Sequence, residues 1–134
     1  MIKNQIEIVS VLDAIKIFEK YPDLFEDCWT DLKIGYGWLP LVQNLCEVLS
    51  YISNPEDLLK IKDIKEKFGL LHIDFSVANN SESEDLTIII QGAEKISYHI
   101  CEACGERGKL CCKDYVFFKT LCDACSVKNL YIKI

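Results

Sequence analysis

Residues 101–125 read CEACGERGKLCCKDYVFFKTLCDAC, and the cysteines near the two ends of this stretch decide the fold of the C-terminal part of the chain. They form two C-x2-C pairs with 17 residues between them: Cys101 with Cys104, and Cys122 with Cys125. This spacing is typical of a structural zinc site, because two residues between cysteines let one tight turn aim both sulfurs at one ion. Gly105 follows the first pair and suits such a turn, since glycine adopts left-handed backbone conformations at little cost. The sequence therefore predicts one structural Zn²⁺ held by four thiolates.

The alternatives for these four cysteines are two disulfides or four buried free thiols. The chain opens with MIKNQIEIVSVLDAIKIFEK, which carries charges every few residues and does not resemble a signal peptide. No stretch approaches the roughly 18 to 20 apolar residues of a membrane span. We therefore expect a soluble, cytoplasmic protein. In that compartment paired cysteines are metal ligands more often than disulfides.

Three further side chains lie close to the predicted zinc site. Cys111 and Cys112 could compete for a ligand position, but the outer pairs already complete a four-thiolate set. We expect one of the two to pack inside a hairpin and the other to be a free thiol. His99 is expected to be an ordinary helix-end histidine, with ligation or a hydrogen bond to a ligand as the alternative.

The net charge of −6 is unevenly distributed along the 134 residues. Residues 1–92 hold 8 basic and 16 acidic side chains (−8), and residues 93–134 hold 7 basic and 5 acidic ones (+2). Nucleic-acid-binding proteins usually carry a concentrated basic face, which this pattern does not show. A nucleic-acid-binding ribbon is therefore the alternative rather than the leading hypothesis, and it would use Lys109, Lys113, Lys119 and the aromatic residues of the hairpin between the two cysteine pairs.

Two helices are predicted in the N-terminal part. The first spans residues 10–20, where Ser10 can cap the start and Pro22 ends the pattern. The second spans residues 39–52, and Pro40 fits its first turn. Apolar residues recur at helical spacing in both segments: Val11, Ile15 and Phe18 in the first, and Trp38, Leu41, Val42, Leu45, Leu49 and Ile52 in the second.

Residues 55–68 read PEDLLKIKDIKEKF and also favour a helix, with Asn54 as the cap and Gly69 after the end. Their apolar residues fall on one helical face: Leu58, Ile61, Ile64 and Phe68. A strand across residues 58–62 is the alternative. Residues 70–77 alternate apolar and polar side chains, which is the pattern of a half-buried strand.

Residues 85–98 are predicted to form a helix that leads into the ribbon, with a strand at residues 87–90 as the alternative. Residues 109–122, KLCCKDYVFFKTLC, should form a hairpin with Tyr115, Phe117 and Phe118 near its core. The expected fold class is α+β, a helical body with a short strand or hairpin followed by a four-cysteine zinc ribbon. The expected domains are an acidic helical body with its strand (1–84) and a helix leading into the zinc ribbon (85–134).

Three segments together resemble a set of small uncharacterised zinc-ribbon proteins of bacteria, phages and prophages. They are GYGWLPLVQNLCEVL (35–49), IKDIKEKFGLLHIDF (61–75) and the cysteine-rich stretch 101–125. Members carry GW before a helix with LC, then a KEKFGGLRFYY-like segment, then a CEVCG…KTLCD ribbon. Here GLLHIDF replaces GGLRFY, so His72 stands where the family has arginine. The resemblance implies an origin in such proteins rather than a catalytic activity.

No catalytic residue is predicted. A cysteine nucleophile needs a base within reach, and Cys28 is far in sequence from both His72 and His99. Acidic and aromatic side chains cluster before the second helix, and Trp and Tyr dominate protein interfaces. The predicted partner-binding residues are Asp27, Trp29, Asp31, Tyr36 and Trp38.

The leading hypothesis is a non-enzymatic accessory protein of phage or prophage type that binds another protein, with a host defence component as a candidate target. Its cofactor would be one structural Zn²⁺. No membrane partner is expected, and the sequence does not indicate an oligomeric state.

Overall fold

The computed structural model describes residues 6–26, 31–78 and 83–134. Four helices and five strands follow in the order α1 (Val11–Lys20), α2 (Leu39–Ile52), β1 (Lys60–Lys67), β2 (Leu70–Ser76), α3 (Glu84–Ser97), β3 (Lys109–Lys113), β4 (Phe117–Leu121), α4 (Asp123–Lys128) and β5 (Ile132–Lys133). Short 3-10 turns lie at Pro22–Leu24, Tyr36–Trp38 and Pro55–Asp57. The predicted α+β class, with helices, two small sheets and a C-terminal group of four cysteines, is confirmed.

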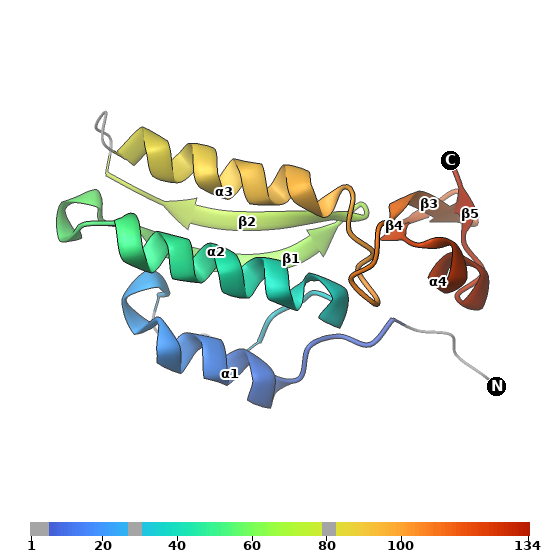
Figure 1. Cartoon of the computed structure of the whole chain (residues 1–134), viewed down its shortest axis with the longest axis horizontal. Coiled ribbons are helices and arrows are strands. Elements are labelled where there is room, and N and C mark those ends of the chain that lie inside the picture. The colour runs from blue at the N-terminus through green and yellow to red at the C-terminus, as the bar shows by residue number, and fades with distance from the viewer. Residues whose placement is uncertain (1–5, 27–30, 79–82) are drawn as a thin grey trace.

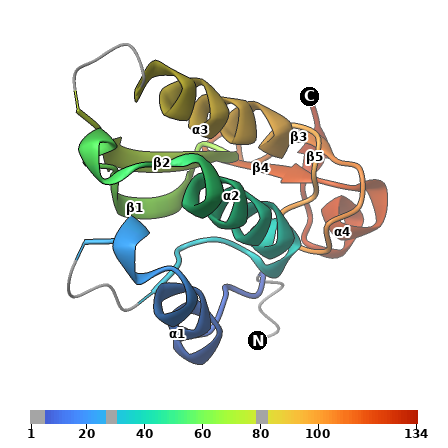
Figure 2. The ribbon, with the colours of Figure 1, turned by 60° about the vertical axis from the view of Figure 1, so that its left-hand side comes forward.

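The N-terminal part forms the larger unit, which we call the body (residues 6–97). Strands β1 and β2 make an antiparallel hairpin, α3 packs against β2, and α2 lies beside α3, with α1 on the far side of α2 (Figures 1 and 2). The backbone N–H of Leu71 in β2 donates to Oγ of Ser97 in α3 (3.0 Å). The largest fully buried apolar side chains of the body are Trp38, Leu32, Ile34, Leu49, Ile61 and Ile64.

Both N-terminal helices form where predicted, but α1 buries Ala14 and Ile17, whereas Val11 of its predicted face is 51% exposed. The hydroxyl of Ser10 accepts a hydrogen bond from the backbone N–H of Asp13 (3.2 Å) and caps α1. Helix α2 starts with Pro40 in its first turn and buries Val42, Leu45 and Leu49 of the predicted face, whereas Ile52 at its end is 39% exposed. Because both helices combine a start signal with a clear apolar face, sequence alone defines them well.

The predicted helix over residues 55–68 is wrong. Only the turn Pro55–Asp57 is helical, and β1 follows from Lys60. Ile61 and Ile64 are both fully buried although they are three positions apart, because a bulge at Lys62 adds one residue to β1. A bulged strand can place buried apolar residues three positions apart, as one turn of a helix does. The apolar pattern of this segment therefore resembles that of a helix. Gly69 (φ +86°) lies in the tight turn between β1 and β2 rather than after a helix.

The next two elements agree with their predicted types. Strand β2 buries Leu71 and Ile73 against the helices, as the alternating pattern indicates. Residues 84–97 form a helix, not the alternative strand. Ile90 of α3 is fully buried in the same apolar cluster as Leu49 of α2. The division of the chain at residues 84 and 85 stays a prediction.

The C-terminal part forms a smaller unit, which we call the module (residues 98–134). Its three strands lie in the order β4-β3-β5, and the predicted hairpin of β3 and β4 is confirmed. The predicted aromatic core of this hairpin is wrong for two of its three residues, because Tyr115 is 93% and Phe117 is 57% exposed, whereas Phe118 is half-buried. Asp114 and Tyr115 both have positive φ and form the tip of the hairpin, so the Tyr115 side chain is exposed to solvent instead of packing inside the module. Among the helices in the described parts of both units, none has the length and apolar character to cross a membrane.

Candidate metal centre

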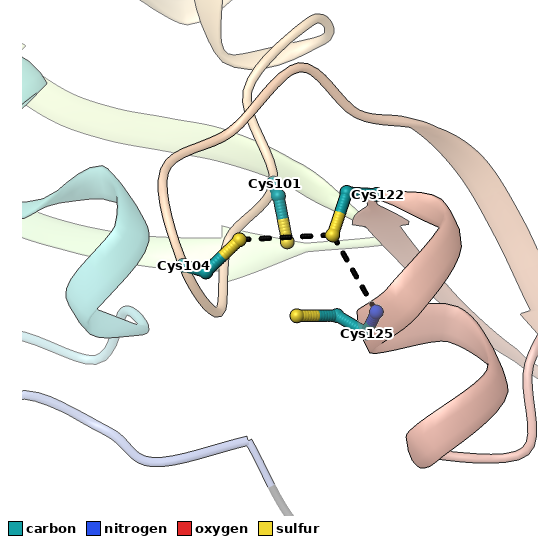
Figure 3. A group of neighbouring side chains, drawn as sticks. All are labelled: Cys101, Cys104, Cys122 and Cys125. Carbon is teal, nitrogen blue, oxygen red and sulfur yellow. Dashed lines mark hydrogen bonds between the residues drawn. The ribbon is translucent and has the colours of Figure 1, made fainter.

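The four cysteines of the two C-x2-C pairs come together at one point (Figure 3). Their sulfur atoms all lie within 4.8 Å of one another, and Sγ of Cys104 is 3.6 Å from Sγ of Cys122. Tetrahedral zinc with Zn–S bonds of about 2.3 Å separates its sulfur ligands by about 3.8 Å. The group can therefore hold one metal ion, and its all-thiolate chemistry fits zinc.

The first pair sits in a tight turn between α3 and β3. The backbone N–H of Gly105 donates to the carbonyl of Cys101 (2.9 Å), and the N–H of Cys101 donates to the carbonyl of Glu106 (2.7 Å). Gly105 has a φ of +87°, a conformation that a side chain would strain. The turn thus aims both sulfurs to one side, as the spacing predicted.

The second pair sits at the junction of β4 and α4. Cys122 is the residue that caps α4, and its sulfur accepts a hydrogen bond from the backbone N–H of Cys125 (3.4 Å). That N–H lowers the pKa of the Cys122 thiol, whereas burial and the neighbouring thiols raise the pKa of Cys125. A bound cation offsets the mutual repulsion of four thiolates, so metal binding and deprotonation are linked.

The other candidate ligands lie outside this group of four. Cys111 is fully buried beside Cys101 and Leu121, and its thiol donates to the carbonyl of Lys109 (3.3 Å). Cys112 is half-buried and His99 is exposed. The prediction that one of the two adjacent cysteines packs inside the hairpin is therefore confirmed for Cys111.

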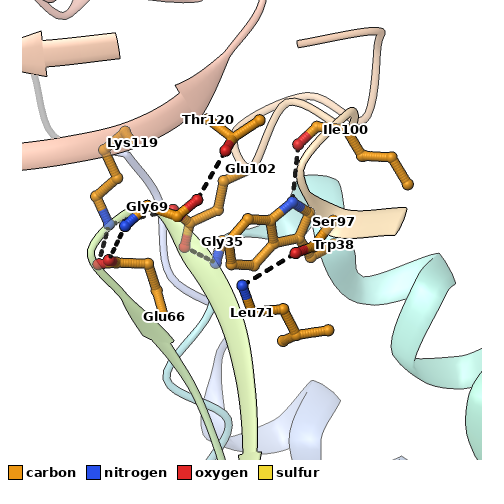
Figure 4. Close-up of polar contacts among 10 residues, drawn as sticks. All are labelled: Gly35, Trp38, Glu66, Gly69, Leu71, Ser97, Ile100, Glu102, Lys119 and Thr120. Carbon is orange, nitrogen blue, oxygen red and sulfur yellow. Dashed lines mark hydrogen bonds and ion pairs between the residues drawn. The ribbon is translucent and has the colours of Figure 1, made fainter. Parts of the chain in front are cut away.

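A buried carboxylate joins the metal centre to the body (Figure 4). Glu102 lies between the first two cysteines and is fully buried. Its Oε2 accepts from the N–H of Gly35 (2.9 Å), its Oε1 accepts from Nζ of Lys119 (3.1 Å), and its carbonyl accepts from the N–H of Gly37 (2.7 Å). Burial raises the pKa of Glu102, and Lys119 and the Gly35 N–H oppose that rise.

The two glycines let the backbones of body and module touch. A Cβ at Gly37 would lie 2.1 Å from the carbonyl oxygen of Cys101, and a Cβ at Gly35 would lie 2.5 Å from that of Glu102. Real Cβ atoms do not approach backbone this closely, so only glycine permits this packing. The segment GYGW therefore serves as the surface on which the first cysteine turn sits.

The β1–β2 turn makes a second connection to the module. Nζ of Lys119 in β4 donates to Oε1 of Glu66 (2.7 Å), and Oε2 of Glu66 accepts from the N–H of Gly69 (2.7 Å). The hydroxyl of Thr120 donates to the carbonyl of Gly69 (2.7 Å). Burial alone would lower the pKa of Lys119, but the carboxylates of Glu102 and Glu66 raise it, so this ammonium stays charged. We use the word seam for all of these contacts between body and module. They join Gly35, Gly37, Glu66 and Gly69 of the body to Cys101, Glu102, Lys119 and Thr120 of the module.

The predicted partner-binding residues do not form one exposed surface. Trp38 is fully buried, and its indole N–H donates to the carbonyl of Ile100 (2.8 Å), so it cannot serve as a surface anchor. Tyr36 is half-buried and its hydroxyl donates to Asp13 (2.6 Å), whereas Asp31 is exposed. Asp27, Trp29 and Cys28 lie outside the described residues. A binding role for Asp31 and Tyr36 stays a prediction.

The seam residues Glu66, Glu102 and Thr120 were missed by the sequence reasoning, and Lys119 was assigned to nucleic-acid binding. Lys119 instead has an 18% exposed side chain held between two carboxylates, which leaves it unavailable to a phosphate. The sequence contains one indication of the seam. The seam lies where the three motifs that carry the resemblance meet: GYGW, KEKFG and CEACG…KTLCD.

Comparison with known proteins adds nothing to this geometry, because no family model, no curated protein and no solved structure matches the chain.

Proposed function

We propose that the chain holds one structural Zn²⁺ through its four clustered cysteines and acts as a non-enzymatic protein-binding accessory protein. The observation that carries this proposal is the module itself, in which a group of four thiols is joined to the body while the tip of the hairpin exposes aromatic side chains.

The donor set supports a structural rather than a catalytic metal. A catalytic zinc keeps one coordination position open for water or substrate, and its ligands usually include histidine or carboxylate. Four thiolates fill the tetrahedral shell. The carboxylate of Glu102, which lies between the first two cysteines in sequence, has both oxygens engaged by Gly35 and Lys119. The ion would therefore hold the two cysteine turns together.

The hairpin tip supports a protein partner. Tyr115, Val116 and Phe117 are 93%, 66% and 57% exposed, and they follow one another on a tight turn. Exposed aromatic residues are enriched where proteins bind proteins. Because the zinc site and the seam hold both strands of the hairpin, the tip would be presented in one orientation, which lowers the entropic cost of binding.

A phage or prophage origin, and a host defence component as the target, rest on the resemblance of the three segments alone. They form the narrower part of the proposal, and identification of the partner would test them.

The test has two parts. Elemental analysis of protein purified without added metal should give one zinc per chain. A tagged chain should then capture a bacterial protein in stoichiometric amount after nuclease treatment, and the double variant Tyr115→Ser/Phe117→Ser should lose it. The control Leu12→Ser changes a 75% exposed apolar residue on α1 and should keep the partner.

Partners that disappear with nuclease would contradict protein binding and favour the nucleic-acid alternative. A partner retained by the Tyr115→Ser/Phe117→Ser variant would contradict the role of the tip. Zinc-free protein with unchanged folding would contradict the structural metal.

A further inference from the structure

Helix α3 carries an exposed apolar stripe on the side that faces away from β2. Ile88 is 64% exposed and Ile96 is 51% exposed, and Gly92 lies midway between them. Residues four apart stand above one another on a helix, so these three positions share one face. The stripe thus has a large side chain at each end and none in the middle.

Gly92 has no role in packing within the described chain. A Cβ built at this position would meet no atom within 4 Å, unlike one built at Gly35 or Gly37. Glycine inside a helix is unfavourable relative to alanine. Gly92 therefore costs helix stability and leaves open space beside α3. Such a glycine is expected where the backbone of another molecule approaches the helix.

The apolar surface continues onto the neighbouring helix. Val48 and Ile52 of α2 are 44% and 39% exposed, and they are also one helical turn apart. Ile52 lines the same surface depression as Ile88 and Ile89 of α3, and the polar residues Asn54, Asp57 and Asp85 line it as well. The stripe is therefore one edge of a wider, partly apolar face that spans α2 and α3, which lie side by side (Figure 2).

This face is complementary to itself. The stripe is symmetric about Gly92, so a second α3 placed antiparallel would set Ile88 of each copy beside Ile96 of the other. The charges match the same arrangement, because α3 has Glu84 and Asp85 in its first turn and Lys95 in its last. An antiparallel pair brings each acidic end beside the basic end of the other copy, and it also opposes the helix dipoles.

We propose that two copies of the chain associate through antiparallel α3 helices that cross at Gly92. The contact is isologous, as a twofold symmetric dimer requires. One helix pair with flanking residues from α2 gives a small interface, so association should be weak and depend on protein concentration. This inference does not rest on the proposed function, because its test measures only the self-association of the chain.

The test is sedimentation velocity over a wide range of protein concentration. The wild-type mass should rise from monomer toward dimer, and Ile88→Lys and Ile96→Lys should each weaken association tenfold or more. Gly92→Leu should also weaken association, because its side chain fills the notch. The control Leu12→Lys on α1 should associate like the wild type. All changed positions are exposed or half-buried, so circular dichroism should show native folding in every variant.

Two results would overturn the proposal: monomers at every concentration, or equal weakening by Leu12→Lys and Ile88→Lys. A charge reversal tests the antiparallel arrangement. Lys95→Glu should weaken association, and addition of Asp85→Lys should restore it, since the two ends then attract again in exchanged order. Failure of the double variant to recover would contradict the antiparallel pairing.

Discussion

The body and the module of this chain are stabilised in different ways. Twenty buried hydrophobic residues form one continuous cluster in the described part of the body, whereas only Cys101, Cys111 and Leu121 form a buried cluster in the module. Small units cannot bury enough apolar surface to fold alone and usually need a metal or disulfides. The body can therefore rely on the hydrophobic effect, and the module must rely on its metal centre and on the seam.

The largest expected effect comes from removal of the metal centre. Structural zinc sites contribute an apparent binding free energy of about 10–16 kcal/mol, which is also folding free energy for the part that they organise. Chelation, Cys104→Ser or Cys125→Ser should unfold the module, as seen in near-ultraviolet circular dichroism and a lower melting temperature. The control Cys112→Ser changes a half-buried thiol outside the group of four and should leave both unchanged.

The thiol of Cys46 reports whether the body survives that treatment. Cys46 is fully buried in α2, and burial raises its pKa to about 12. At pH 8 only about one such thiol in ten thousand is a reactive thiolate. Alkylation followed by mass spectrometry should mark the four cysteines of the metal centre after chelation but not Cys46. Rapid labelling of Cys46 would show that body and module unfold together.

The next effect tests the seam. Lys119→Met removes the ammonium between Glu66 and Glu102 and leaves two poorly hydrated carboxylates without a countercharge, each held only by a backbone N–H. Breaking a buried ion pair on one side costs about 3–5 kcal/mol, which denaturant unfolding would measure. Lys113→Met is the control, because Nζ of Lys113 lies only over the Tyr131 ring (5.8 Å to its centre) and its loss should cost about 1 kcal/mol or less. Equal costs for the two variants would mean that the ion pairs of the seam add little.

Glycine substitutions give a smaller effect and separate two kinds of glycine. Gly37→Ala should destabilise the protein by about 1–3 kcal/mol through forced backbone shifts, because its Cβ meets the carbonyls of Cys101 and Glu102. Gly92→Ala should stabilise the dilute protein by up to about 1 kcal/mol, since its Cβ meets nothing. Thermal unfolding of both variants measures the contrast, and a tolerated Gly37→Ala would contradict the close approach at the seam.

The smallest effect is confined to the body. Ser10→Ala removes the hydroxyl that caps α1 and should cost about 1 kcal/mol in global unfolding. Zinc content should not change, because α1 does not contact the metal centre. The matched variant Ser50→Ala, where the hydroxyl bonds only the carbonyl of Glu47 on an exposed surface, should cost less. A loss of zinc from Ser10→Ala would show that body and module are coupled more tightly than the seam explains.

Sequence alone was sufficient where a feature depends on local pattern. The cysteine spacing predicted the metal centre, and cap residues with an apolar face predicted α1 and α2. The pattern failed at residues 60–67, because a bulge at Lys62 gives a strand the three-residue spacing of a helix. It failed at Tyr115 for another local reason, since two successive residues with positive φ turn that side chain outward.

The seam could not be predicted, because it depends on which distant segments meet. Glu102 looks like an exposed turn residue in CEACG, and only the approach of Gly35 and Lys119 makes its burial tolerable. Trp38 was assigned both to the apolar face of the second helix and to the partner-binding residues, since nothing near it in sequence shows that Ile100 will accept its indole N–H. Long-range polar pairs of this kind leave no periodic signal along the chain.

The close approach at Gly37 also limits how the sequence can change over generations. A side chain there would collide with backbone that lies more than sixty positions later, so no nearby substitution can compensate for it. Gly35, Glu102, Glu66 and Lys119 would have to change together, because they contact one another. Tyr115, Val116 and Phe117 at the hairpin tip are exposed and could change without disturbing these contacts. Descendants of this chain could thus acquire new recognition at the tip while inheriting the joint unchanged.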